Sequence, residues 1–266
     1  MNDSGFQYAI CHLSVAPVRR WADVTGEMTT QARAGEAVQI LEETRGLWRV
    51  RLLADGYEGW VDSRQFTPPQ QEKPPEGTVL TDEVTAWARC VDRTLLLPLG
   101  TALPAFSPED HTFRLGDEVW TWESRVHCPP PVPDWPALLR ESRQYLGAPY
   151  LWGGRTLWGI DCSGLMQTLF RHQGIALRRD CVDQITQGEA VDGLSRARPG
   201  DLAFFETTRD GGRHVGLVLG GAEVLHASAF VRIDELSERG ITVLGNGAYS
   251  HRLTAIRRVW PDRSQG

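Results

Sequence analysis

Cys162 stands where a glycine-rich loop meets the first turn of a helix-like apolar pattern, in the stretch Gly-Ile-Asp-Cys-Ser-Gly-Leu (159–165). Backbone N–H groups at the start of a helix have no intrahelical partner and carry partial positive charge. That position favours the thiolate, which is the nucleophilic form of cysteine, and nearby N–H groups could also bind an oxyanion. A buried structural cysteine is the alternative, and the position of Cys162 alone leaves both interpretations open.

Two histidines could supply the base that such a thiol needs. His214 begins the apolar run HVGLVLG, and His226 lies in the next such run, EVLHASA. Gly220-Gly221 between the runs suits a hairpin turn. Adjacent antiparallel strands would place both imidazoles on one face, so that one takes the thiol proton and the other orients it. Together the three residues favour nucleophilic catalysis over a structural cysteine.

The elements around these residues predict an α+β domain. Apolar residues recur at helical spacing in WPALLRESRQYLG (135–147) and in CSGLMQTLFRHQG (162–174), and each segment ends in a glycine. Strand-like runs follow, namely DLAFFE, HVGLVLG, EVLHASA and AIRRVW. Helices first and strands afterwards are typical of the α+β class.

Two proline-rich breaks, residues 67–77 and 128–136, interrupt the chain. Proline removes a backbone donor and fixes φ, so such runs behave as stiff connectors. We therefore expect three domains, at residues 1–67, 76–128 and 134–263.

The first two of these domains read as all-β. Short runs rich in β-branched and aromatic residues predict a small barrel in the first, with turns at Arg45-Gly46 and Asp55-Gly56. The Asp-Gly pair suits a tight hairpin, because both positions tolerate positive φ. The second domain again shows short hydrophobic runs separated by Pro, Gly and Asp, although its sequence similarity to the first is too low to establish a repeat.

The composition argues against several classes of partner. The 266 residues carry a formal net charge of −6 and contain no long Lys/Arg run. Binding to nucleic acid or to an anionic membrane needs clustered positive charge, so we expect neither. No apolar run approaches a membrane span, and the N-terminal residues lack the pattern of a signal peptide. We expect a cytoplasmic protein, or a secreted one if an export signal precedes this sequence.

The cysteines and the remaining histidines predict no metal site and no cofactor. Five cysteines, an odd number without a CxxC pair, argue against a disulfide framework and a cysteine-rich zinc site. The other histidines show no partner pattern and are interpreted as surface or core residues: His12, His111, His127, His172 and His251.

Several motifs together resemble the signature of NlpC/P60 cysteine peptidases. They follow in the family's order and spacing: Tyr-Leu-Trp-Gly-Gly-Arg-Thr (150–156), the stretch around Cys162, Arg-Pro-Gly-Asp-Leu-Ala-Phe-Phe (198–205), His-Val-Gly-Leu-Val-Leu (214–219) and Leu-His-Ala-Ser (225–228). Upstream, Gly-Glu-Met-Thr-Thr-Gln (26–31) and Asp-Gly-Tyr-Glu-Gly-Trp-Val (55–61) look like parts of a bacterial SH3 domain. The resemblance implies a papain-like catalytic domain preceded by two small SH3-like β-barrels.

This architecture is similar to the dipeptidyl-peptidase VI branch, the γ-D-glutamyl-L-diamino acid endopeptidases. The resemblance implies a thiol protease of murein peptide recycling, which cuts between D-Glu and the diamino acid of peptides with a free N-terminal L-Ala. It assigns Cys162 as nucleophile, His214 as general base and His226 as the orienting residue. Tyr150 matches the family's tyrosine near the oxyanion site. Neither the oligomeric state nor the preferred diamino acid is indicated.

The resemblance also implies a binding site for the substrate's terminal ammonium. Asp161 would bind it together with Glu27 and Tyr57 of the first SH3-like domain, and Ser163 would contact the substrate beside them. A partly buried ammonium needs a carboxylate partner, and such a cage would exclude chains whose amino group is capped.

Asp180 and Cys181 fall where relatives carry a loop that lines the substrate groove, so both are predicted to contact substrate. For Cys181 we prefer a small hydrophobic residue of the groove wall to a catalytic role.

Two alternatives remain. One is a cell-wall hydrolase that acts on intact peptidoglycan, against which the absent export signal and the ammonium cage both count. The other is a non-catalytic wall-binding protein built from SH3-type modules, against which the set Cys162, His214 and His226 argues.

Overall fold

In the computed structural model, which describes residues 5–75 and 77–260, the chain divides into two units. The first contains the residues up to Pro129 together with the short segment Trp152–Thr156, and the second contains the remaining residues from Pro130 onward. Both regions that were expected to be all-β therefore lie in the first unit. The predicted boundaries at residues 1, 76 and 263 fall outside the described residues.

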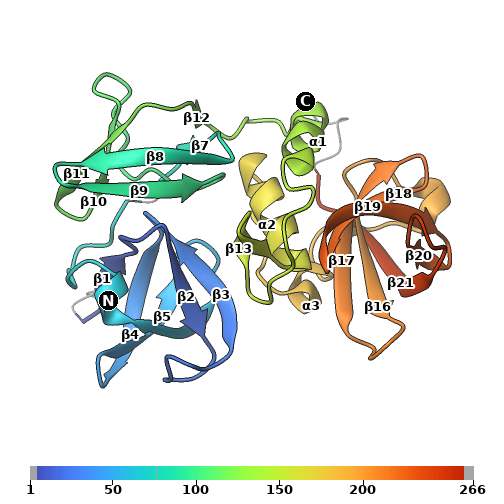
Figure 1. Cartoon of the computed structure of the whole chain (residues 1–266), viewed down its shortest axis with the longest axis horizontal. Helices are drawn as coiled ribbons and strands as arrows, with labels where there is room; N and C mark the ends of the chain where they lie inside the picture. Colours follow the sequence, from blue (N-terminus) through green and yellow to red (C-terminus); the bar gives the residue numbers. More distant parts are fainter. Residues whose placement is uncertain (1–4, 76, 261–266) are drawn as a thin grey trace. The chain divides into compact units, whose positions relative to one another are not determined.

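Six antiparallel strands in the order β1-β4-β5-β6-β2-β3 form the first sheet, which curves into a small barrel (Figure 1). In β5 the buried Trp48, Val50 and Leu52 alternate with exposed arginines. Because side chains alternate across a strand, one face of each strand fills the core. The elements are β1 (Gln7–Ile10), β2 (Val15–Arg19), β3 (Met28–Arg33), β4 (Ala37–Thr44), β5 (Leu47–Leu52), β6 (Glu58–Asp62) and the 3-10 helix η1 (Ser63–Gln65).

The tight turn of this barrel lies at Arg45-Gly46. These two residues, with φ of 51° and 77°, join β4 to β5. The hairpin predicted at Asp55-Gly56 is present, since β5 and β6 pair antiparallel, but its turn is longer than predicted. The N–H of Leu52 donates to the carbonyl of Tyr57, which leaves residues 53–56 between the paired positions. There the Asp55 carboxylate accepts a hydrogen bond from the N–H of Tyr57 at 3.0 Å. Such a side-chain-capped turn is an alternative that the same residue types favour.

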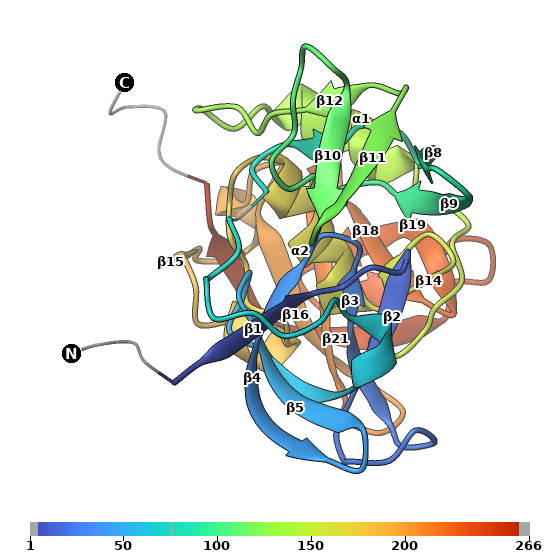
Figure 2. The same ribbon diagram turned by 90° about the vertical axis from the view of Figure 1, so that its left-hand side faces the viewer.

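A second sheet, in the order β10-β11-β8-β9, follows in the same unit (Figure 2). The strands β7 and β12 form a separate pair (Figure 1). Trp120 and Trp122 of β11 are fully buried in its core, to which the first barrel contributes Ile10, Ala34 and Ala37. The two all-β regions therefore share a core. The strands are β7 (Leu80–Thr81), β8 (Thr85–Cys90), β9 (Arg93–Pro98), β10 (Thr112–Leu115), β11 (Glu118–Trp122) and β12 (Val126–His127), and the segment 152–156 adds β13 (Arg155–Thr156).

The second unit is built around a closed sheet. Its strands run in the order β21-β16-β17-β18-β19-β20, and β20 pairs back onto β21. The four predicted strand runs form β16, β17, β18 and part of β21, whereas β19 and β20 were not predicted. The strands are β14 (Gly159–Ile160), β15 (Glu189–Ala190), β16 (Leu202–Thr207), β17 (Arg213–Gly220), β18 (Glu223–Ser228), β19 (Phe230–Ser237), β20 (Gly240–Thr242) and β21 (Tyr249–Arg258).

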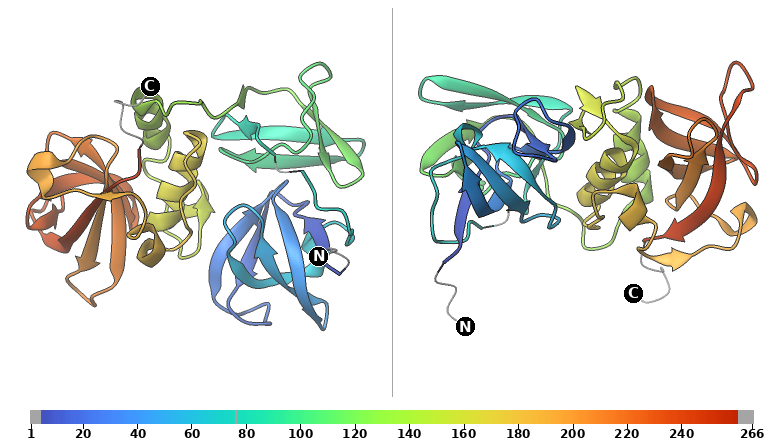
Figure 3. Two further views of the ribbon diagram at one scale, coloured as in Figure 1. Left: turned by 180° about the vertical axis from the view of Figure 1, so that it is seen from behind. Right: turned by 90° about the horizontal axis from the view of Figure 1, so that it is seen from below.

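Both predicted helices are present, as α1 (Trp135–Arg143) and α2 (Cys162–His172). Helix α2 is buried along nearly its whole length and packs against β17 and β18 (Figure 3). It ends before Gly174, whose φ of 74° suits a glycine. The short α3 (Cys181–Gln184) and the 3-10 helix η2 (Leu194–Arg196) complete the unit. Within the described ranges, every helix is too short or too polar to span a membrane.

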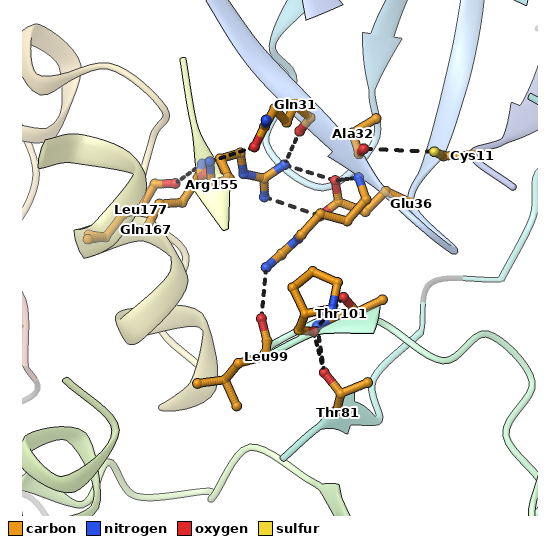
Figure 4. Close-up of polar contacts among 12 residues, drawn as sticks. Cys11, Gln31, Ala32, Glu36, Thr81, Leu99, Thr101, Arg155, Gln167 and Leu177 are labelled. Atoms are coloured by element: carbon orange, nitrogen blue, oxygen red, sulfur yellow. Dashed lines mark hydrogen bonds and ion pairs between the residues drawn. The ribbon is translucent and has the colours of Figure 1, made fainter. Parts of the chain in front are cut away.

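The segment Trp152–Thr156 lies against the first barrel. The guanidinium of Arg155 donates to the carbonyl oxygen of Gln31 at 2.7 Å and to the two carboxylate oxygens of Glu36 at 2.8 and 3.1 Å (Figure 4). All three residues are buried. Gly153 has φ of 78°, and a side chain there would meet the backbone of β3 at 2.7 Å. A glycine is therefore required for this close approach.

Candidate active site

The predicted nucleophile, Cys162, is the first residue of α2 and is 7% exposed. Asp161 caps the helix, because its backbone is extended and its carboxylate accepts the N–H of Gly164 at 2.7 Å. Such a cap satisfies one of the unpaired donors at the helix start and fixes where the helix begins. Cys162 therefore opens the helix, as the sequence predicted.

Strands β17 and β18 bring His214 and His226 together. Gly216 lies opposite His226, so His214 is the diagonal neighbour of His226 on the same face. Nε2 of His214 and Nδ1 of His226 are 2.9 Å apart, and both rings are buried. The backbone of Val215, the residue after His214, hydrogen-bonds the Cys162 thiol. The structure thus assembles the three predicted catalytic residues in one unit.

A buried carboxylate continues this row of histidines. Oδ2 of Asp234, from β19, lies 3.0 Å from Nε2 of His226. The same oxygen accepts the Nε–H of Arg232 at 2.8 Å, and Oδ1 accepts the N–H of Leu244 at 3.0 Å. Sequence reasoning missed Asp234, because it did not predict β19 as a strand and therefore had no register in which to place it.

His251 also belongs to this cluster, although the sequence was interpreted as giving it no partner. It comes from β21, is 5% exposed, and stacks on His214 with ring centroids 4.4 Å apart and planes inclined by 32°. Its Nδ1 lies 2.7 Å from Oγ of Ser250. The interpretation as a core or surface histidine agrees with this burial, but the contact with His214 was not predicted, because it arises only when β21 pairs with β20 and closes the sheet.

Burial determines the protonation of the nucleophile. It raises the pKa of the Cys162 thiol to about 12, with the nearby Asp161 carboxylate acting in the same direction. The backbone of Val215 and the guanidinium of Arg179 lower this pKa but do not outweigh burial. The helix start was expected to favour the thiolate; burial acts in the opposite direction, because it removes the water that would solvate a charged sulfur.

The histidines are held neutral. Burial first, and then the neighbouring rings of His226 and His251, lower the pKa of His214 well below 6.5. Burial also lowers the pKa of His226, against the hydrogen bond to Asp234 that raises it. The pKa of His251 falls to about 4, again mainly through burial. A neutral imidazole beside a neutral thiol can accept its proton during attack.

These shifts predict the pH profile of catalysis. His214 acts as a base only when neutral, so we expect the acidic limb of kcat/KM below pH 6.5. Because Cys162 keeps its proton up to a pKa of about 12, we expect a plateau through neutral and mildly alkaline pH. Steady-state kinetics between about pH 4 and 9 at constant ionic strength measure both features. An acidic limb centred at or above 6.5 would contradict the lowered pKa.

Tyr150 also lies at this site. Its backbone N–H donates to the carbonyl of Ala229 at 2.9 Å, which holds the residue at the start of β19. Burial, followed by the charges of Cys162 and Asp161, raises the pKa of the Tyr150 phenol. The hydroxyl therefore keeps its proton and remains a hydrogen-bond donor near Cys162, as an oxyanion partner must.

Arg179 engages Asp161 and Ser163 at the start of α2. Its guanidinium donates to both carboxylate oxygens of Asp161, at 3.1 and 2.6 Å, and to Oγ of Ser163 at 2.9 Å. All three residues are buried. The structure thus gives Asp161 two roles that the sequence did not predict, as a helix cap and as an ion-pair partner. An ammonium bound there would share the carboxylate with Arg179.

Asp180 and Cys181 lie at the start of α3, both partly exposed. Gln184, one turn after Cys181, donates to the carbonyl of Ser163 at 3.0 Å, so α3 packs beside the first turn of α2. Burial and then the proximity of Cys162 raise the pKa of the Cys181 thiol. Cys181 is therefore a neutral side chain near the nucleophile, whereas substrate contact by either residue stays a prediction.

Glu27 and Tyr57 lie in the first unit. The Glu27 carboxylate, with a side chain 38% exposed, pairs with Arg20 at 2.8 Å and accepts the indole N–H of Trp152 at 2.9 Å. Tyr57 is partly buried in the loop before β6. Sequence reasoning did not anticipate either partner of Glu27.

Two family models match parts of the chain. The model of the NlpC/P60 family matches residues 147–258, and that of the bacterial dipeptidyl-peptidase Sh3 domain matches residues 18–66. A gamma-D-glutamyl-L-lysine dipeptidyl-peptidase of Bacillus cereus is 28% identical, covering 91% of this chain and 78% of the relative. The Bacillus subtilis enzyme of the same name is 28% identical, covering 88% and 81%.

The fold is also found among solved structures. The crystal structure of an NlpC/P60 family protein from Bacillus cereus matches with a TM-score of 0.77, over 96% of this chain and all of that chain. At 23% identity this likeness shows a shared fold.

Proposed function

We propose that this chain is a cysteine endopeptidase of murein peptides, because the NlpC/P60 family model matches residues 147–258 and the model of the bacterial dipeptidyl-peptidase Sh3 domain matches residues 18–66. It hydrolyses the bond between γ-D-Glu and the diamino acid in peptides that begin with a free L-Ala. The observation that carries the proposal is the buried pair of His214 and His226 next to Cys162, whose thiol is hydrogen-bonded by the backbone of Val215. The relatives named gamma-D-glutamyl-L-lysine dipeptidyl-peptidase supply the substrate class.

The site geometry supports a two-step reaction. Cys162 attacks the amide carbonyl while its proton passes to His214, and a tetrahedral intermediate forms at the γ-D-Glu carbonyl. His214 gives the proton to the amine of the diamino acid as the C–N bond breaks, which leaves a thioester on Cys162. His214 then activates the water that hydrolyses the thioester and returns a proton to the released Cys162 sulfur. The Tyr150 hydroxyl donates to the oxyanion that forms in each step.

Specificity for a free amino terminus rests on Glu27, Tyr57 and Asp161. Carboxylates are the natural partners of an ammonium that leaves water, since an unpaired charge is costly to bury. Arg20 and Trp152 hold the Glu27 carboxylate in place. We further propose that residues 76–128 are a second SH3-like domain, which the sheet of β8 to β11 supports, and that the catalytic fold is papain-like.

Mass spectrometry of the products tests the substrate class. We expect L-Ala-γ-D-Glu-L-Lys and its diaminopimelate analogue to release the dipeptide L-Ala-γ-D-Glu, and the N-acetylated peptides to remain intact. Efficient cleavage of the acetylated peptides, or release of fragments from intact peptidoglycan, would favour a cell-wall hydrolase instead. Binding without any cleavage would favour a wall-binding protein.

Two substitutions in the first unit test the ammonium site. Glu27→Ala and Tyr57→Phe are each expected to lower kcat/KM for the free tripeptide about tenfold, because each removes a hydrogen bond to a charged group. Glu43→Ala, which removes an exposed carboxylate of β4, is the matched control and is expected to change nothing. Unchanged kinetics in both test variants would exclude this site.

A further inference from the structure

We propose that Asp234 is a positioning residue of this peptidase, which fixes the tautomers of His226 and His214 so that Nδ1 of His214 is left as the free base. The inference rests on the proposed peptidase function and deepens it. It concerns a residue that does not touch the substrate and acts through the two histidines.

The hydrogen bonds form one continuous row. Asp234 Oδ2 lies 3.0 Å from His226 Nε2, and His226 Nδ1 lies 2.9 Å from His214 Nε2. All three side chains are at most 4% exposed, so water does not compete for these contacts. Both ring nitrogens of His226 are therefore hydrogen-bonded, and the tautomer of this ring is determined by Asp234 on one side and His214 on the other.

The carboxylate cannot rotate away. Arg232 Nε donates to Oδ2 at 2.8 Å, and the N–H of Leu244 donates to Oδ1 at 3.0 Å. Burial alone would raise the pKa of Asp234, but hydrogen bonds from His226, Arg232 and Leu244 outweigh it and hold the pKa at about 2. Asp234 is thus ionised at neutral pH and presents acceptors only.

An ionised Asp234 determines every proton in the row. Because the carboxylate only accepts, His226 must carry its proton on Nε2, and neutral His226 then has a bare Nδ1. That bare nitrogen requires the proton of His214 to be on Nε2. The remaining nitrogen of His214, Nδ1, is then unprotonated, and its lone pair can accept the Cys162 proton. When it does, the positive charge on His214 is stabilised through His226 by Asp234 and is opposed by Arg232.

Asp234→Asn tests this role. The amide has one acceptor oxygen in place of two, and it must serve Arg232, Leu244 and His226. Turning its NH₂ toward His226 reverses both tautomers and places a proton on Nδ1 of His214. We expect kcat to fall about 10²- to 10⁴-fold with a smaller change in KM, by analogy with the tautomer error of a serine protease triad. The control is Asp201→Asn, an equally buried carboxylate paired with Arg258 at 2.7 Å, for which kcat should remain near wild type.

A spectroscopic readout separates positioning from simple structural support. In protein labelled with ¹⁵N-histidine, ring ¹⁵N shifts should show His214 and His226 protonated on Nε2 in the wild type and on Nδ1 in Asp234→Asn. Wild-type His214 protonated on Nδ1, or an Asp234→Asn variant with wild-type kcat, would overturn the proposal. The wild-type spectrum needs neither a folded variant nor a substrate. Wrong tautomers of His214 and His226 would therefore be recognised even if the proposed peptidase function failed, and the two failures can be told apart.

Discussion

Cys162→Ala is expected to lower kcat for the tripeptide on the order of 10⁶-fold, the scale seen when the nucleophile of a covalent-catalysis triad is removed. The effect is large because Tyr150 and His214 assist an attack by the Cys162 sulfur, and alanine has no nucleophilic atom in that place. Substrate binding should persist, since the substitution removes one sulfur atom from a site defined mainly by other side chains. Product formation by mass spectrometry and binding by calorimetry measure the two effects separately.

Cys181→Ala is the matched control for this prediction. Both thiols lie in the second unit, close enough for the charge of one to affect the pKa of the other, and both pKa values are raised by burial. Only Cys162 opens α2 beside Val215 and His214, so Cys181→Ala should keep most of the wild-type turnover. Equal losses in the two variants would mean that the nucleophile is wrongly assigned.

The parts of the site that the sequence predicted are those set by local rules. A glycine-rich loop followed by an apolar run at helical spacing predicted Cys162 at the start of α2, where the structure has it. Two strand-like runs around Gly220-Gly221 placed His214 and His226 on one face, because the side-chain period of a strand is two. In each case a few neighbouring residues suffice to determine the geometry.

The parts that the sequence did not predict depend on pairing between distant segments. Asp234 reaches His226 only through the register of β19 on β18, and His251 reaches His214 only because β21 closes the sheet against β20. The partner of Arg155 is still more remote, since Glu36 lies 119 positions earlier in the chain. The spacing of residues along the chain does not indicate such contacts. From the sequence alone, buried polar residues of this kind therefore cannot be told from ordinary surface residues.

Glu36→Gln is expected to destabilise the first unit by about 3–5 kcal/mol, the cost of breaking a buried ion pair from one side. The Glu36 carboxylate accepts hydrogen bonds from Arg155 at 2.8 and 3.1 Å and from Arg33 at 3.1 Å. All three residues are at most 3% exposed. Glutamine keeps the volume of the side chain but removes the negative charge that the buried guanidinium groups of Arg33 and Arg155 share. The free-energy cost of burying these two cations is then no longer offset by an ion pair.

Glu58→Gln provides a control of the same chemistry at the surface. Glu58 also accepts from two arginines, Arg49 at 2.9 Å and Arg51 at 2.7 Å, but its side chain is 32% exposed. Solvent screens these two ion pairs, so we expect the free energy of unfolding to fall by only about 0–1 kcal/mol in this variant. Hydrogen exchange of β3 and β4 peptides in the intact chain, together with urea unfolding, measures both variants. Because Arg155 belongs to the segment just upstream of the nucleophile, we also expect Glu36→Gln to release residues 152–156 to exchange. Equal losses in the two variants would show that the buried cluster contributes no more than a surface ion pair.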